Sequence, residues 1–342
     1  MIHDFPLTEW FFYAVKWLYG LLGNSYFLTI VIVTLILRLI QVYPDIKSRQ
    51  TQQKQAALQP EIDKLKKKYA DNPQKLNQEQ QKLMKENGVG CLAGCLPMLL
   101  TLPLFFCFLA AFRFWGYEQT VKLTYETVID QQQGDESGFL RSQETFNSYK
   151  FLWITNIWQP DSGFAPVVTP AKTVASYPKI HNLVLFHQGY TDIRGNHVSG
   201  EDIWNTFLEN GLAEGEFGTD TMTLVKTEES QQKYDELMRV YKTGNNNGWF
   251  ILPILATAFQ FLMAWLGQRQ SKKLNPAAAS QQQSMNFMMY LFPVMSLFIC
   301  MSSTSAFSLY WVLSSVFQII SSAIISRFML KKAKASGEIT VE

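Results

Sequence analysis

Five apolar segments, each close to the length that crosses a bilayer, set the main constraint on how this chain can fold. A membrane-spanning helix needs about 20 predominantly apolar residues, and the residues between the segments carry nearly all of the charge. Charged residues make up 17% of the chain, which a soluble protein could match, so the segregation of apolar residues decides the class. We therefore predict an all-α membrane protein with several spans and soluble insertions. The segments are Tyr26–Tyr43, Cys91–Phe114, Trp249–Leu266, Met285–Met301 and Ala306–Phe328.

The charge of the connecting segments predicts the side of the membrane on which each one lies. Lys47–Glu86 contains ten Lys or Arg and five Asp or Glu, and short basic stretches also follow the third and fifth segments. Because basic loops stay on the cytoplasmic side, we predict a multi-pass protein with its N-terminus outside and its C-terminus in the cytoplasm. Gly116–Asn247, with ten basic and eighteen acidic residues, is then extracytoplasmic.

These assignments give a predicted domain organisation. Residues 1–23 lack a basic start and carry aromatic residues at helical spacing, which favours an interfacial helix over a sixth span. Spans follow at 24–46 and 91–115, with a cytoplasmic helical hairpin at 47–90 between them, and three more spans lie within 248–332 before a cytoplasmic tail at 333–342. The extracytoplasmic loop at 116–247 contains a small α/β insertion at about 164–246.

Local signals support the hairpin and the insertion. Asn72 followed by Pro73 is a helix-start signal for the second helix of the hairpin. In the insertion, Asn182–Phe186 and Met222–Val225 are predicted as short strands, while Ser199–Leu208 and Glu228–Tyr241 are predicted as helices. The basic hairpin is either a plain connection or a platform for lipid headgroups, a ribosome or a nascent chain.

Arg38 is the only charged residue in the first apolar segment. A guanidinium at the bilayer centre costs roughly 2.5–3.5 kcal/mol on insertion scales, so it must be hydrated, paired or used. Snorkelling of its long side chain toward the headgroups is the structural alternative. The default interpretation of an intramembrane charge is a functional site.

Several motifs occur together in a fixed order. They are TLILRLIQVYPDIKSRQ around Arg38, ALQPEIDKLKKKYADNPQKLNQEQQKLMKENGV in the hairpin, GCLPMLLTLPLF, FLWITNI, ILPILAT and LYWVLSS. In these motifs the chain resembles the YidC/Oxa membrane protein insertases of the bacterial type, in the five-span form without a large N-terminal periplasmic domain. The resemblance covers roughly Asn24–Phe114, Trp153–Ser162 and Asn247–Lys332.

The resemblance implies both a fold and an activity. Family members have a five-helix core with a hydrophilic groove, open to cytoplasm and lipid, that inserts small membrane proteins alone and assists others beside the Sec translocon. Arg38 and Thr34 match groove positions, and Tyr310 with Trp311 matches an aromatic pair that contacts the inserting segment. Gln260 is a further groove candidate, with an interhelical hydrogen bond as the alternative. The polar turn Ser302–Ser305 departs from the family pattern.

Other function classes are weaker. An anion-selective transporter or channel could use Arg38 as its binding charge, but no internal repeat supports it. The five segments contain no acidic residue, and HExxH and GxSxG motifs are absent, so we predict no enzyme. The resemblance implies no cofactor or metal. It implies nascent membrane proteins, membrane lipids, the Sec translocon and the ribosome as partners, and a functional monomer in the bacterial plasma membrane.

Overall fold

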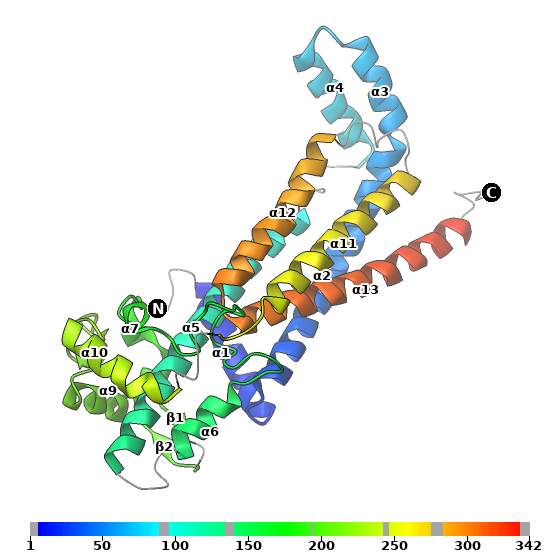
Figure 1. The fold of residues 1–342 in the computed structure, drawn as a ribbon. Helices are drawn as coiled ribbons and strands as arrows, with labels where there is room; N and C mark the ends of the chain where they lie inside the picture. The colour runs from blue at the N-terminus through cyan, green and yellow to red at the C-terminus, as the bar shows by residue number, and fades with distance from the viewer. Residues whose placement is uncertain are drawn as a thin grey trace. The chain divides into compact units, whose positions relative to one another are not determined.

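The structure, a computed structural model, describes residues 6–88, 96–133, 140–192, 194–241, 246–274 and 283–335. Within these ranges the fold is mostly helical and the strands are very short (Figure 1). The five predicted spans fall on long helices, apart from Cys91–Cys95, which lie outside the described residues. The all-α membrane fold class is therefore confirmed. The helices are α2 (Tyr26–Ala57), α5 (Leu96–Gln133), α11 (Ile251–Leu274), α12 (Gln283–Ser302) and α13 (Ser305–Ala335).

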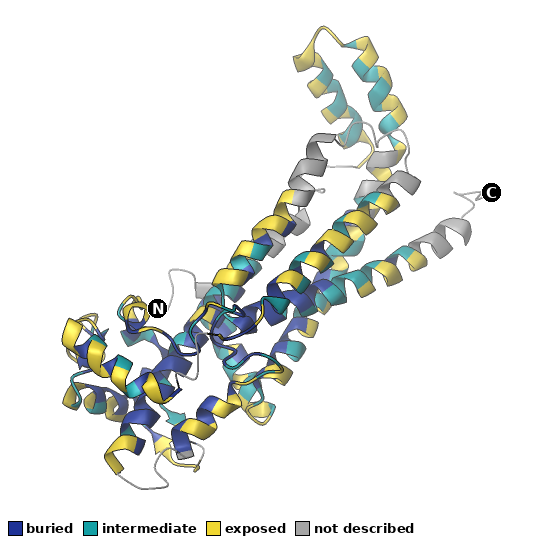
Figure 2. Cartoon of the chain, in the orientation of Figure 1, coloured by how far each residue is buried: buried dark blue, intermediate teal, exposed yellow. Residues whose placement is uncertain are grey.

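Three of these helices are long and apolar enough to cross a membrane within the described residues. The spanning stretches are Tyr26–Ser48 of α2, Ile251–Arg269 of α11 and Ser305–Phe328 of α13, while Leu291–Ser302 of α12 is a shorter apolar stretch. Many large apolar side chains on these helices are exposed (Figure 2). Exposed apolar surface on this scale suits a lipid environment rather than water.

The chain divides into two compact units, which we describe separately. The first unit contains residues 1–29, 107–254 and 298–309, and the second contains residues 30–106, 255–297 and 310–342. The boundaries between the units fall within the five long helices, so each of these helices has residues in both units.

In the first unit, α1 (Pro6–Leu21) packs against α5. Phe12 and Val15 of α1 are buried, whereas Trp10 and Trp17 on the opposite face are exposed. The Lys16 ammonium donates to the buried Glu118 carboxylate of α5 over 2.7 Å. This two-faced character agrees with the amphipathic helix expected from the sequence, and its position relative to the bilayer stays a prediction.

Helix α5 differs from the expected span because it does not end near residue 115. It continues without interruption to Gln133, into the segment that we predicted as loop. The polar residues of this extension, including Glu118, Thr124, Glu126 and Asp130, are buried. They are covered by the insertion, which belongs to the same compact unit. A helix continued by tertiary packing of this kind carries no apolar signal in its own sequence.

The insertion contains short elements that surround the extension of α5. Helix α6 (Leu140–Ser148) precedes the insertion, whose own helices are α7 (Ala171–Val174), α8 (Val184–Gln188), α9 (Gly200–Glu209) and α10 (Glu228–Leu237), with 3-10 turns at Ile180–Asn182 and Met238–Tyr241. Two antiparallel ribbons pair β1 (Tyr190–Thr191) with β2 (His197–Val198), and β3 (Ala213–Glu214) with β4 (Thr223–Leu224).

The predictions for the insertion are confirmed except at one element. Ser199 and Asp202 form a reciprocal capping box at the start of α9, α10 with its following turn covers Glu228–Tyr241, and β4 lies within Met222–Val225. The strand predicted at Asn182–Phe186 is wrong, because the chain there forms a 3-10 turn and then α8. Its consecutive apolar residues are all buried, and such a run does not distinguish a strand from a buried helix.

In the second unit, α3 (Gln59–Lys68) and α4 (Pro73–Glu86) form the predicted hairpin. The Asn72 side chain accepts a hydrogen bond from the Lys75 backbone N–H over 3.1 Å, which confirms the predicted helix start. Neither helix has a buried residue, and exposed and intermediate residues alternate along both helices in Figure 2.

Candidate functional site

Arg38 is held by neutral groups. Its Nε donates to Ser314 Oγ over 2.9 Å and its Nη2 donates to the same oxygen, while its Nη1 donates to Gln41 Oε1 over 2.8 Å. Ser314 lies on α13 and Gln41 lies one turn after Arg38 on α2, and both partners are buried. The guanidinium therefore links two of the membrane helices within the second unit.

Among the described residues, no carboxylate lies within salt-bridge distance of Arg38. Asp45, about two turns further along α2, acts on it electrostatically from a longer distance. A guanidinium has five N–H donors, and its bonds to the described residues use three of them. Within the described part of the chain, the charge is thus oriented by neutral dipoles without a salt-bridge partner, and it retains capacity for an acidic or polar ligand.

The structure brings some of the predicted site residues together. The Tyr310 hydroxyl lies beside both Ser314 and Arg38. Thr34 is completely buried one turn before Arg38, and its Oγ1 donates to the Ile30 carbonyl of its own helix over 2.6 Å. Thr34 therefore shapes the same helix face without bonding to the guanidinium.

Trp311 and Gln260 lie in two different environments. Trp311 is buried and meets Phe105 edge-on, with ring centroids 4.9 Å apart, and also packs near Phe292 at 6.1 Å. Gln260 of α11 is buried, and its Oε1 has no hydrogen-bond partner among the described residues. Among the described residues, this oxygen therefore does not make the interhelical bond considered for Gln260.

Sequence reasoning missed the two residues that orient Arg38. Neither Ser314 nor Gln41 is among the candidate groove residues that the sequence indicates. Both could have been found from spacing, because Gln41 is three residues after Arg38 on α2 and Ser314 is four residues after Tyr310 on α13. Residues at these spacings share one face of a helix.

A second charged group, Asp161, lies in the first unit and is fully satisfied. Its Oδ1 accepts from the Trp249 and Phe250 N–H groups over 2.8 and 3.2 Å, and its Oδ2 accepts from the Leu252 N–H over 2.7 Å and from Trp153 Nε1 over 3.3 Å. The three backbone N–H groups are at the beginning of α11, where helix donors lack internal partners and the dipole favours an anion. Asp161 therefore fixes the start of that helix.

The same loop also holds the start of α13. We call residues 153–162 the junction loop. The Gln159 carbonyl accepts from both the N–H and the hydroxyl of Ser305, over 2.9 and 2.6 Å, and the Ile157 carbonyl accepts from the Ala306 N–H over 2.9 Å. The polar turn at Ser302–Ser305, which departs from the family pattern, thus supplies a donor to this loop.

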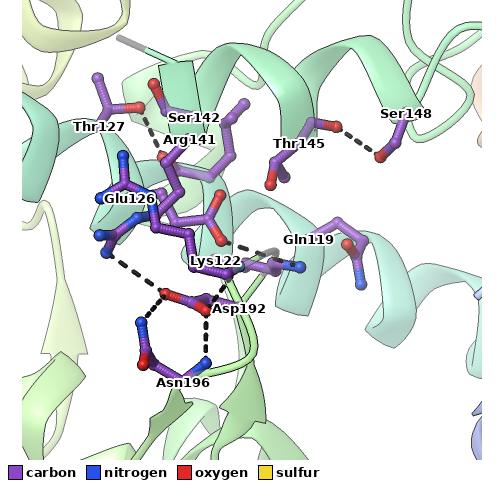
Figure 3. A network of polar contacts seen from close by, with 12 residues as sticks. Gln119, Lys122, Glu126, Thr127, Arg141, Ser142, Thr145, Ser148, Asp192 and Asn196 are labelled. Atoms are coloured by element: carbon purple, nitrogen blue, oxygen red, sulfur yellow. Dashed lines mark hydrogen bonds and ion pairs between the residues drawn. The ribbon is translucent and has the colours of Figure 1, made fainter. Parts of the chain in front are cut away.

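A third polar cluster lies on the extension of α5 (Figure 3). Lys122 Nζ is 3.9 Å from Glu126 Oε1, and Arg141 Nη1 of α6 is 3.7 Å from Asp192 Oδ2 in the β1–β2 connection. Neither Glu126 oxygen has a hydrogen-bond partner among the described residues. Burial raises the pKa of Glu126, and nearby Lys122 partly offsets this shift. Burial also lowers the pKa of Lys122.

With this geometry described, comparisons with known proteins identify the family. A family model described as 60Kd inner membrane protein matches residues 17–192 and 210–333. The chain belongs to this family. The matched ranges include the Arg38 cluster, the hairpin and the junction loop, and they confirm the resemblance to the YidC/Oxa proteins.

Relatives of the 60Kd inner membrane protein family are similar to parts of the chain. A Clostridium perfringens protein named membrane protein insertase YidC is 36% identical over 155 residues, which cover 45% of this chain and 53% of the relative. A Rickettsia felis protein of the same name is 43% identical over 100 residues, covering 29% of this chain and 18% of the relative. The chain thus matches about half of the clostridial protein and about a fifth of the rickettsial one. Family membership and the apolar helices together make it a multi-pass membrane protein.

Proposed function

We propose that this protein is a membrane protein insertase and chaperone that accepts nascent segments through a hydrophilic groove open to the cytoplasm and to lipid. The observation that carries the proposal is the state of Arg38, a charge within a membrane helix that is oriented by Ser314 and Gln41 without a carboxylate in salt-bridge contact among the described residues. The names of the relatives, membrane protein insertase YidC, agree with this function.

The mechanism follows from electrostatics in a partly hydrated site. A substrate with a short polar or acidic outer segment must move that segment across hydrocarbon. A hydrated groove shortens the low-dielectric region that the segment has to cross. A fixed guanidinium attracts the segment through charge-assisted hydrogen bonds. The bond must remain weak enough for release, and neutral partners permit this because they reorient without separating an ion pair. The apolar part of the substrate then moves into lipid.

Two further parts of the proposal concern orientation and partners. With basic connecting segments in the cytoplasm, the N-terminus is outside, the C-terminus is inside, and the insertion is extracytoplasmic. Nascent membrane proteins are the clients, and lipids, the ribosome and the Sec translocon are partners of a functional monomer. The exposed, basic α3–α4 hairpin is the surface that would meet the cytoplasmic partners.

Rescue of cells depleted of their own insertase tests the function. We expect this chain to restore insertion of substrates with one or two spans. Failure of rescue, with expression and membrane localisation verified, would contradict the proposal.

An anion-selective transporter or channel is the second candidate, because Arg38 retains donors for an anion. The two candidates separate in proteoliposomes containing the purified chain. An insertase protects the outer segment of an added substrate from protease without passing chloride or phosphate, whereas a transporter passes the anion without any substrate protein.

A further inference from the structure

Leu152 combines two unfavourable features. Its side chain is 77% exposed, and its backbone has a left-handed φ of 51°, a conformation that a leucine rarely adopts. It sits in a tight turn in which Phe151 and Ile154 exchange backbone hydrogen bonds of 3.0 and 2.8 Å. The turn therefore exposes an apolar side chain and strains its backbone. Exposure of that side chain is unfavourable in water.

Other apolar residues near this turn are exposed in the same way. Phe164 is 87% exposed and Trp249 is 64% exposed. Phe250, the neighbour of Trp249, also has a left-handed φ, of 61°, and its ring lies 5.9 Å from that of Phe164. We call the exposed residues Phe27, Leu152, Phe164 and Trp249 the apolar rim.

Contacts within the first unit connect the segments that carry the rim residues. The rings of Phe27 and Phe151 are stacked with centroids 5.1 Å apart, and Phe151 precedes Leu152. Trp153 and Trp249 both donate to Asp161, which fixes the Leu152 turn relative to the segment that enters α11. The rim is therefore held in place by the junction loop and does not depend on a chance arrangement of mobile side chains.

The position of the rim along the chain indicates what covers it. Phe27 is the second residue of the spanning stretch of α2, and Trp249 comes two residues before that of α11. The rim is thus continuous with two membrane spans at the ends that begin them. Aromatic and apolar residues are favoured at this depth, where one side is apolar and the other is wet. The exposed Lys150 beside the turn suits contact with anionic headgroups.

We propose that the apolar rim inserts into the boundary between acyl chains and headgroups and seats the first unit on the bilayer surface. Lipid is the occupant because Phe27 lies within, and Trp249 directly precedes, a stretch that is long and apolar enough to cross a membrane. The strained Leu152 turn then has a function, since burial of its side chain in lipid offsets the unfavourable backbone. Asp161 is the residue that positions the apolar rim for this insertion.

Depth-dependent fluorescence quenching in lipid nanodiscs tests the proposal with the full-length chain. An environment-sensitive fluorescent amino acid is introduced by codon suppression at position 152 or 164, in separate variants. The matched control has it at position 229 on α10, because the Glu229 side chain is 78% exposed, close to the value of Leu152. The quenchers are nitroxide-labelled lipid and aqueous iodide, and both faces of a nanodisc are accessible to iodide.

We expect lipid nitroxides to quench positions 152 and 164 at least threefold more strongly than position 229, and iodide to show the reverse order. Iodide quenching at 152 and 164 equal to that at 229 would place the rim in water and overturn the proposal. Protection from both quenchers would also overturn it, because the rim would then be covered by protein. Leu152→Asn, which retains a residue that tolerates the left-handed backbone, should weaken lipid quenching at position 164 without loss of folding.

Discussion

Asp161 and Arg38 are two charged residues at the membrane helices of this protein, and they are treated in opposite ways. Asp161 accepts four hydrogen bonds from backbone and indole N–H groups at the start of α11. Arg38 is bonded only to two neutral side chains within the described residues, and two of its five donors are not used by them. One charge is satisfied by the fold, and the other is oriented by it.

The difference shows how a charged residue in a membrane protein can be recognised as structural or as functional. A buried charge with a complete set of partners stabilises the fold, and losing one side of such an arrangement is costly. A charge with an incomplete set of partners adds less stability, because it exchanges full hydration for fewer hydrogen bonds. It remains able to bind a ligand of opposite charge, and we therefore expect mutations at the two sites to affect different measurements.

Asp161→Ala should produce the largest loss of stability. It leaves the N–H groups at the start of α11 without their acceptor, and each buried donor left unsatisfied costs about 1–3 kcal/mol. We expect a clearly lower thermal unfolding midpoint in detergent. Glu209→Ala on the exposed end of α9 is the control. If both variants unfold at the same temperature, Asp161 does not fix the helix.

Arg38→Ala should impair function more than stability. We expect at least tenfold slower insertion of substrates with acidic outer segments, since the attracting charge is lost, with an unfolding midpoint close to that of the wild type. Arg38→Lys should retain part of the activity because it keeps the charge but not the forked donors. Equal insertion of all substrates by Arg38→Ala and wild type would return Arg38 to the snorkelling alternative.

Ser314→Ala should have an intermediate effect on function. It removes the acceptor for two guanidinium nitrogens but leaves the Gln41 bond, so we expect roughly two- to fivefold slower insertion of acidic substrates, corresponding to about 0.5–1 kcal/mol of activation free energy. Ser315→Ala is a matched control, because the buried Ser315 hydroxyl donates to the Trp311 carbonyl of its own helix. Identical rates for the two variants would show that Ser314 does not orient Arg38.

Glu126→Gln should have the smallest effect, seen in the pH dependence of stability. Burial raises the pKa of Glu126 above its ordinary value, so the folded state becomes less stable as pH rises from the ordinary pKa through the raised one. Lys122, Arg141 and Tyr190 face this carboxyl. The amide variant should gain stability relative to the wild type as pH increases from about 4.5 to 8, measured by thermal unfolding at each pH. A constant difference across this range would contradict the assignment.

The sequence predicted those features that rest on local patterns. Apolar runs located the long helices, the Asn72–Pro73 signal located the start of α4, and the Ser199–Asp202 capping box located α9. Arg38 was recognised because a lone charge in an apolar segment is conspicuous. Each of these signals lies within about ten residues of the feature that it predicts.

The features that were missed depend on distant partners. The extension of α5 to Gln133 is stabilised by the insertion that covers its polar residues, such as Glu126. The junction loop was recognised as a motif, but its partners at Trp249 and Ser305 lie about 90 and 150 residues away. No local periodicity encodes pairings of that length, so the role of Asp161 became visible only in three dimensions.

The junction loop also imposes an order on the biogenesis of the protein. Asp161 and Gln159 are synthesised long before most of their partners, since the backbone donors to Asp161 begin at Trp249 and those to Gln159 come from Ser305. Until translation reaches Ser305, the Gln159 carbonyl cannot make its bonds to α13. The loop therefore closes last on the emerging α13, and the first unit is completed only when nearly the whole chain has been made.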